Sequence, residues 1–174
     1  KIKNIAENIS KSKDAGNDIV VVVSAMGQST DDLNNLAYSL SKNPPRRELD
    51  MLLSTGEQVT IALLSIALNE YGTPAISMTG SQVGIITESI HGRARILEIK
   101  TSRIEDHLAE GYVVIVAGFQ GSSLSHNGSM EITTLGRGGS DTSAVALSTA
   151  LGAETCEIYT DVPGVLTTDP RIVT

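Results

Sequence analysis

The sequence predicts an α/β fold, a three-layer α/β/α sandwich with a mostly parallel central sheet. Two continuous apolar runs, residues 19–23 and 112–117, are typical of strands that helices cover on both faces. Segments with apolar residues at helical spacing alternate with these runs, as they do in βαβ units. The length of 174 residues suits a single domain. We therefore expect one α/β domain.

The elements follow in order from local patterns. Apolar residues Ile2, Ile5 and Ile9 at helical spacing predict a helix over residues 1–13 that ends before Gly16. Acidic residues 31–32 favour a second helix as far as Leu40. The other expected elements are an apolar helical stretch over 48–70 interrupted at 54–57, a strand at 75–79, a helix over 104–110, a hairpin turn at Asn127-Gly128, a helix over 141–151 and a third buried strand at 156–159.

Composition excludes several classes of function. The net charge of −7 argues against a basic nucleic-acid-binding face, and 3% aromatic residues argue against a base-stacking platform. The one cysteine, Cys156, excludes an internal disulfide and reads as a small core residue. The histidines show no metal-ligand spacing, and the apolar runs are too short to span a bilayer. We expect a soluble, cytoplasmic protein that binds neither nucleic acid nor membrane.

Three loops directly follow the three predicted buried strands. They cover residues 24–30, 118–121 and 160–164 and are rich in Gly, Ser, Thr and Asp. Ligands of open α/β sheets bind beyond the carboxyl ends of the strands. The sequence therefore predicts a ligand site at this edge.

The glycine-rich segment 136–141 is the most informative of the polar segments. Its glycines permit close approach of the backbone to a ligand, and the helix that follows offers free N–H groups to an anion. Arg137 presents a fork that binds a carboxylate or a phosphate at two points. Asp141 either binds a substrate amine, holds a cation, or only caps the helix.

Other polar residues have a functional and a structural reading. Glu57 interrupts an apolar helix, where it either receives a substrate amino group or stands in a first helical turn below an N-cap. The 24–30 loop with Thr30 either binds substrate or phosphate, or forms a turn with an N-cap. Asp161 and Arg171 contact a nucleotide or belong to Asx and Pro turns.

Six motifs in order resemble one family. They are VSAMG (23–27), MLLSTGE (51–57), VAGFQG (116–121), TLGRGGSD (134–141), YTDVPG (159–164) and TDPR (168–171). Over nearly the whole chain, they resemble the catalytic domain of aspartokinases, in the amino acid kinase superfamily. The resemblance implies an amino acid kinase-like fold and an enzyme that uses ATP to phosphorylate the side-chain carboxylate of L-aspartate. This reaction gives 4-phospho-L-aspartate and opens lysine, threonine and methionine biosynthesis.

The resemblance also implies roles for individual residues. Arg137 and Asp141 would be catalytic, and Mg²⁺ would bridge the phosphates without a metal-binding residue of this chain. The implied aspartate-binding residues are Thr30, Glu57, Arg137, Ser140 and Asp141. The implied ATP-binding residues are Thr160, Asp161, Leu166, Thr167, Thr168, Asp169, Pro170 and Arg171.

The chain departs from the family pattern at both ends. The family opens with a strand and a Lys-Phe/Tyr-Gly-Gly loop whose lysine meets the transferring phosphate, and it continues into allosteric ACT domains that would mediate oligomerisation. We therefore expect residues 1–174 to be a partial catalytic domain, inactive alone. Leu166 stands where many members carry Tyr. Two alternatives remain: a kinase of acetylglutamate or glutamate, and a non-catalytic ligand-binding or dimerisation module.

Overall fold

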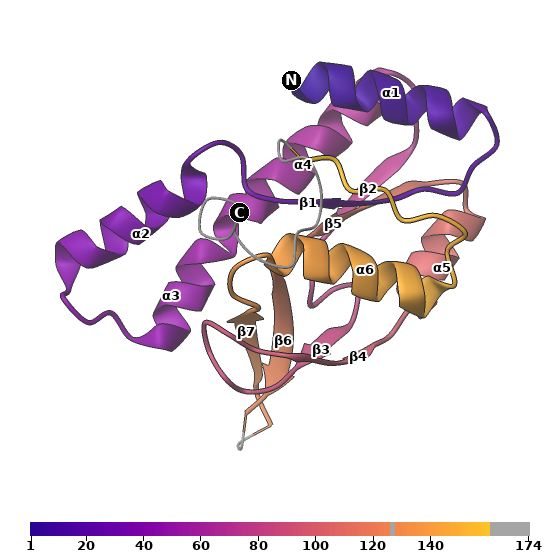
Figure 1. The fold of residues 1–174 in the computed structure, drawn as a ribbon. Helices are drawn as coiled ribbons and strands as arrows, with labels where there is room; N and C mark the ends of the chain where they lie inside the picture. Colours follow the sequence, from indigo (N-terminus) through magenta and orange to yellow (C-terminus); the bar gives the residue numbers. More distant parts are fainter. Residues whose placement is uncertain (126–127, 161–174) are drawn as a thin grey trace, which may run out of the picture.

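The computed structural model describes residues 1–125 and 128–160, which form a mixed α/β domain (Figure 1). The helices are α1 (Ile2–Asp14), α2 (Ser29–Leu40), α3 (Arg46–Leu53), α4 (Thr55–Glu70), α5 (Ser102–Ala109) and α6 (Gly139–Leu151). The strands are β1 (Val20–Val23), β2 (Ala75–Met78), β3 (Ile85–Thr87), β4 (Ile96–Ile99), β5 (Val113–Ala117), β6 (Gln120–Leu124) and β7 (Met130–Thr134).

A parallel sheet with the order β1-β5-β2 lies at the centre of the fold. All five residues of β5 are buried, as the continuous apolar run predicts. Val23 pairs with Ala117 and Met78 with Val116, so the three strands end at the same edge of the sheet. The predicted parallel strands over 19–23, 75–79 and 112–117 are thus confirmed.

Helices cover both faces of this sheet, which confirms the three layers (Figure 1). On one face, α1 and α4 pack Ala6, Ile61, Leu64 and Leu68 against Ala75, Val113, Ile115 and Ala117. On the other face, Ile104 of α5 and Leu147 of α6 pack with Met78, Val114 and Val116. The alternation of β5 side chains between the two clusters follows from the two-residue period of a strand.

A second sheet, with the order β4-β3-β6-β7, was not expected. Only the β3–β6 pair in it is parallel. Its strands are three to five residues long, and β3, β6 and β7 carry buried polar side chains, so hydrophobic periodicity does not reveal them. The Thr87 and Thr133 hydroxyls, for example, satisfy each other in the interior. The hairpin predicted at Asn127-Gly128 is confirmed by the antiparallel β6–β7 pair, although Asn127 lies outside the described residues.

The apolar stretch predicted over 48–70 is two helices that meet at Ser54. Together, Arg46–Glu70 is long and apolar enough to cross a membrane by length and composition, contrary to the expectation that every apolar run is too short. In the fold, however, this stretch serves as core: Ile61, Leu64 and Leu68 pack against the central sheet. The break at Ser54 places a new helix N-terminus beside the carboxyl edge of the sheet.

The third strand predicted at residues 156–159 is wrong. These residues have no strand partner within the described part of the chain, and Cys156 is exposed rather than a core residue. Ile158 is 38% and Tyr159 90% exposed. A short apolar run becomes a strand only where a ladder of hydrogen bonds and a covering layer are both present, and neither is present here.

Candidate active site

The candidate site lies at the carboxyl edge of the parallel sheet. Chain segments leave this edge after each strand: residues 24–28 after β1, 79–80 after β2 and 118–119 after β5. Helices α2, α4 and α6 begin at this edge or next to it. The side-chain amide of Gln120 donates to the Ser54 carbonyl at 2.9 Å and joins the start of α4 to the start of β6, three residues after β5 ends. The sequence predicted that three loops lie together at this edge. The structure confirms this for two of them, residues 24–30 and 118–121.

Glu57 is the buried acid of this edge. It stands in the first turn of α4 and is only 3% exposed. Its Oε1 accepts a hydrogen bond from the Ala25 N–H at 3.1 Å, which ties it to the loop after β1. Its Oε2 is buried and has no hydrogen-bond partner within the described residues. Ser54 occupies the N-cap position of α4 but makes no side-chain cap hydrogen bond, and Glu57 stands in the first turn, as the structural reading of this segment expects.

Burial raises the pKa of the Glu57 carboxyl, and backbone hydrogen bonds from its own N–H and from Ala25 lower it by less. Desolvation disfavours the charged form of a carboxyl. A cation at Oε2 would favour the charged form again. Glu57 therefore has the electrostatic character of a site that a positive ligand group completes.

The glycine loop leads from β7 into α6. Gly138 has φ +69° at the N-cap, a left-handed conformation in which glycine carries no penalty. Gly139 packs on Phe119, where a Cβ would lie 2.9 Å from the ring and 3.2 Å from the Phe119 Cα. Phe119 itself has φ +65°, the single positive φ of a non-glycine residue in the described chain. Its N–H donates to the Ser143 hydroxyl at 3.2 Å, so the strained turn is held against α6.

The three predicted residues of this loop lie at the start of α6. Ser140 touches the turn after β5, since a Cβ on Gly118 would lie 3.0 Å from it. Arg137 and Asp141 are exposed, and neither makes an ion pair or side-chain hydrogen bond within the described residues. Asp141 is in the first turn of the helix and is not its N-cap, so the capping interpretation is wrong.

Thr30 lies at the same edge on α2. It is half-buried and stands one turn before Leu33, whose side chain lies beside Gly56 at the start of α4. The structure thus brings Thr30, Glu57 and the Ser140 loop to one edge of the sheet.

The predicted nucleotide residues are described only in part. Thr160 is exposed in irregular chain. Asp161, Leu166, Thr167, Thr168, Asp169, Pro170 and Arg171 lie outside the described residues.

The described residues hold no group of three or more His, Cys, Asp or Glu side chains that fits a metal ion. Mg²⁺ in kinases is bound largely by phosphate oxygens and water, so this donor set is compatible with a metal that arrives with the nucleotide.

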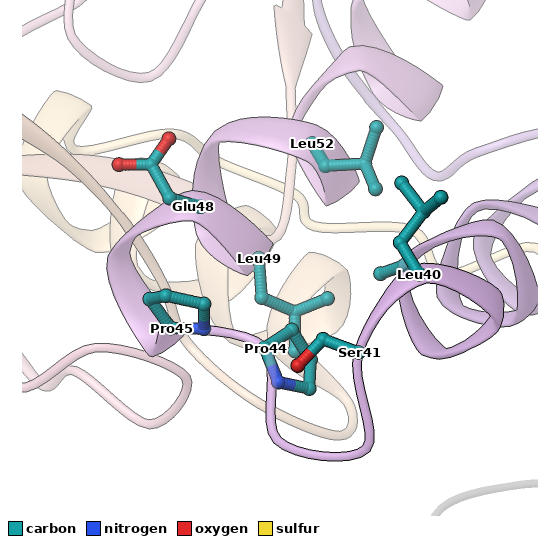
Figure 2. A pocket seen from close by; sticks show the side chains of 8 residues that line it. Leu40, Ser41, Pro44, Pro45, Glu48, Leu49 and Leu52 are labelled. Atoms are coloured by element: carbon teal, nitrogen blue, oxygen red, sulfur yellow. The ribbon is translucent and has the colours of Figure 1, made fainter.

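An apolar groove elsewhere on the molecule does not fit a polar substrate. It lies where α2 ends and α3 begins, and Figure 2 shows Leu40, Pro44, Leu49 and Leu52 around it. Only Ser41 and Glu48 give it polar character. It is formed by the end of α2 that is opposite to Thr30, which separates it from the carboxyl edge of the sheet.

Sequence reasoning missed one buried acid, Asp50 of α3, which is 1% exposed. Its position within an apolar helical run was the available signal, the same signal that identified Glu57. His91, which shows no metal-ligand spacing, lies with its Nδ1 2.8 Å from the Asp50 carboxylate.

The fold is an α/β domain, and the carboxyl edge of its parallel sheet carries a buried acid and a glycine loop. The profile of the Amino acid kinase family matches residues 1–174. The chain therefore belongs to the amino acid kinase family.

Curated and solved relatives are similar over nearly the whole chain. An aspartokinase of Bacillus sp. (strain MGA3) is 61% identical over 99% of this chain and 41% of its own length. The crystal structure of aspartate kinase from Synechocystis is 60% identical with a TM-score of 0.77, over 99% of this chain and 27% of its own. E. coli aspartokinase III in complex with aspartate and ADP is 35% identical with a TM-score of 0.66, over 84% and 32%. The chain thus spans less than half the length of these relatives.

Proposed function

We propose that this chain forms part of the catalytic domain of an aspartate kinase, which transfers the γ-phosphoryl group of ATP to the side-chain carboxylate of L-aspartate. The product is 4-phospho-L-aspartate, the first intermediate toward lysine, threonine and methionine. The high identity to aspartokinases supports this proposal, as do the aspartate and ADP bound in the E. coli relative.

The open Oε2 of Glu57 is the observation that carries the proposal. A buried carboxylate oxygen without a partner is costly, and an α-ammonium group of the substrate would supply both the charge and the hydrogen bonds. An N-acetylated amino acid has no such group. Glu57 therefore favours an acceptor with a free amine, L-aspartate or L-glutamate, over acetylglutamate.

The other residues of the edge suit the anionic parts of the reactants. Arg137, unpaired in the described structure, binds a substrate carboxylate through its fork. Ser140 and the first N–H groups of α6 bind anionic oxygens, and Thr30 adds a hydroxyl from α2. Asp141 shares the binding of the ammonium group with Glu57. Phosphoryl transfer depends mainly on such positioning and charge neutralisation.

The nucleotide pocket in this proposal uses Thr160, Asp161 and residues 166–171. ATP supplies the phosphoryl group, and Mg²⁺ on its phosphates neutralises their charge. We place the protein in the cytoplasm, and we propose that it oligomerises through regulatory domains. These placements rest on the family alone.

Comparing three phosphoryl acceptors in parallel tests the proposal. The full-length protein is incubated with ATP and Mg²⁺, and ADP release is measured with L-aspartate, L-glutamate and N-acetyl-L-glutamate in parallel. We expect release with L-aspartate at least about 100-fold faster than with the other two, a difference near 2.7 kcal/mol. Preference for acetylglutamate would assign the chain to another kinase of the family. Ligand binding without turnover of any acceptor would favour the non-catalytic module.

A further inference from the structure

The buried carboxylate of Asp50 gathers two segments that are distant in sequence. Its Oδ2 accepts hydrogen bonds from the N–H groups of Gly92 and Thr134 at 3.0 and 3.2 Å, and Nδ1 of His91 lies 2.8 Å away. Its Oδ1 accepts from the Thr134 hydroxyl at 2.6 Å. A carboxylate only accepts, so Nδ1 of His91 is the donor in this contact.

These contacts fix the residue from which the glycine loop departs. Thr134 is the last residue of β7, and Arg137 follows three residues later. The Ala94 N–H donates to the Thr134 carbonyl at 2.9 Å, so the 91–94 turn holds Thr134 from a second direction. The turn also lies against the loop itself, because a Cβ on Gly136 would be 3.4 Å from the Gly92 carbonyl.

Asp50 contacts none of the residues assigned to the ligand. It does fix the two segments beside the start of the glycine loop, the 91–94 turn and the end of β7. α3, the 91–94 turn and the end of β7 are held through one carboxylate. Loss of this carboxylate would leave the N–H groups of Gly92 and Thr134 and the Thr134 hydroxyl without their acceptor. The direction in which Arg137 and the start of α6 leave β7 would then no longer be set.

We propose that Asp50, with His91 and Thr134, is a positioning unit that holds the loop of residues 136–140 in its ligand-binding conformation. This inference rests on the proposed function for the identity of the ligand, L-aspartate. The positioning itself is a property of the loop and is measurable without any ligand.

The first experiment uses Asp50→Ala in the full-length protein, with Asp106→Ala, an exposed acid of α5, as the matched control. We expect the KM for aspartate to rise about tenfold or more, since small misplacements of binding groups have effects of this size. The KM for ATP should change by less than about threefold, because the loss concerns the loop and not the rest of the site. A purely structural acid would change the amount of folded protein but not this ratio of KM values.

The second readout is hydrogen exchange of the backbone amides of residues 136–140 without ligand. We expect exchange in Asp50→Ala to be about tenfold faster there, whereas the amides of β5 exchange through global unfolding and accelerate only as the free energy of unfolding falls. Unchanged exchange in a folded Asp50→Ala protein overturns the inference. If wild-type protein neither binds nor phosphorylates aspartate, the proposed function fails, and the exchange data still decide the role of Asp50.

Thr134→Val and Thr134→Ser keep the inference testable if Asp50→Ala does not fold. Valine removes the hydroxyl that donates to Oδ1, and serine restores it. We expect Thr134→Val to raise both loop exchange and the KM for aspartate, and Thr134→Ser to return both to within about twofold of wild type. Equal behaviour of the two variants contradicts the proposed role.

Discussion

Two buried carboxylates, Asp50 and Glu57, lie seven residues apart on consecutive helices, and the protein treats them differently. Asp50 is 1% exposed and meets donors from His91, Gly92 and Thr134 at both oxygens. Glu57 is 3% exposed, and Oε2 has no partner within the described residues. Burial raises the pKa of Glu57. The same degree of burial thus accompanies a satisfied acid and an unsatisfied one.

This difference shows how a buried acid that stabilises the fold is distinguished from a buried acid that binds a ligand. A buried carboxylate whose acceptor capacity is used by the protein stabilises the fold, because removing it leaves donors unsatisfied. A buried carboxylate with open capacity weakens the unliganded fold and gains from a cationic ligand. Each of the following predictions tests one side of this contrast.

The largest expected effect is on stability, from Asp50→Ala. The substitution leaves several buried donors without an acceptor, so we expect a loss of about 3 kcal/mol or more in the free energy of unfolding. Urea denaturation followed by circular dichroism gives this value from the midpoint and slope. Asp106→Ala, on an exposed face of α5, should stay within about 0.5 kcal/mol of wild type. A loss of unfolding free energy as small as that of the control would show that Asp50 does not stabilise the fold.

The next largest expected effect is on the affinity for aspartate, from substitution of the exposed Arg137. Arg137→Ala should raise the Kd for aspartate by about 10- to 100-fold, or 1.4 to 2.7 kcal/mol, while the Kd for ATP changes much less. Arg137→Lys keeps the charge but not the forked guanidinium group, so its Kd for aspartate should lie between those of wild type and Arg137→Ala. Separate calorimetric titrations of the two ligands measure these constants, with Arg103→Ala on α5 as the control. Equal weakening of both ligands would refute the assignment of Arg137 to aspartate.

A smaller effect of opposite sign is expected at Glu57. Glu57→Gln removes a buried charge that has an open oxygen, so the unliganded protein should gain about 1 kcal/mol, or ~2–4 °C in Tm. The same variant should lose most of its affinity for aspartate. Glu70→Gln, at the exposed end of α4, is the matched control and should change neither property. A drop in Tm would show that Glu57 is a structural acid like Asp50.

The smallest effect is the pH dependence of this gain. Because the folded-state pKa of Glu57 is raised, protonation favours the folded protein. This contribution is complete below the ordinary value of about 4.3 and is lost as the pH rises through the raised folded-state pKa. The Tm difference between Glu57→Gln and wild type should therefore be largest at neutral pH and shrink on acidification. A difference that is constant with pH would contradict the raised pKa.

Much of the fold followed from local patterns. The all-apolar runs at 19–23 and 112–117 became the paired strands β1 and β5 because only a doubly covered sheet buries both of their faces. The polar second sheet did not follow, since its buried side chains are hydroxyls such as those of Thr87 and Thr133, which satisfy each other across 46 residues of sequence, and no local pattern shows this. The run at 156–159 resembled a strand by composition but lacks a ladder partner among the described residues.

Some features of the candidate site were likewise predictable from the sequence, and others were not. The sequence alone predicted Glu57, Arg137 and Asp141 as residues for charged ligands, from an acid in an apolar helix and an arginine among glycines. Ser140 followed only from the family resemblance. The tertiary structure alone decided which buried acid stays open, because the donors that satisfy Asp50 come from residues 41, 42 and 84 positions further along the chain. A residue type fixes which hydrogen bonds an atom is able to form. Only the packed fold determines whether the protein or a ligand supplies the partner.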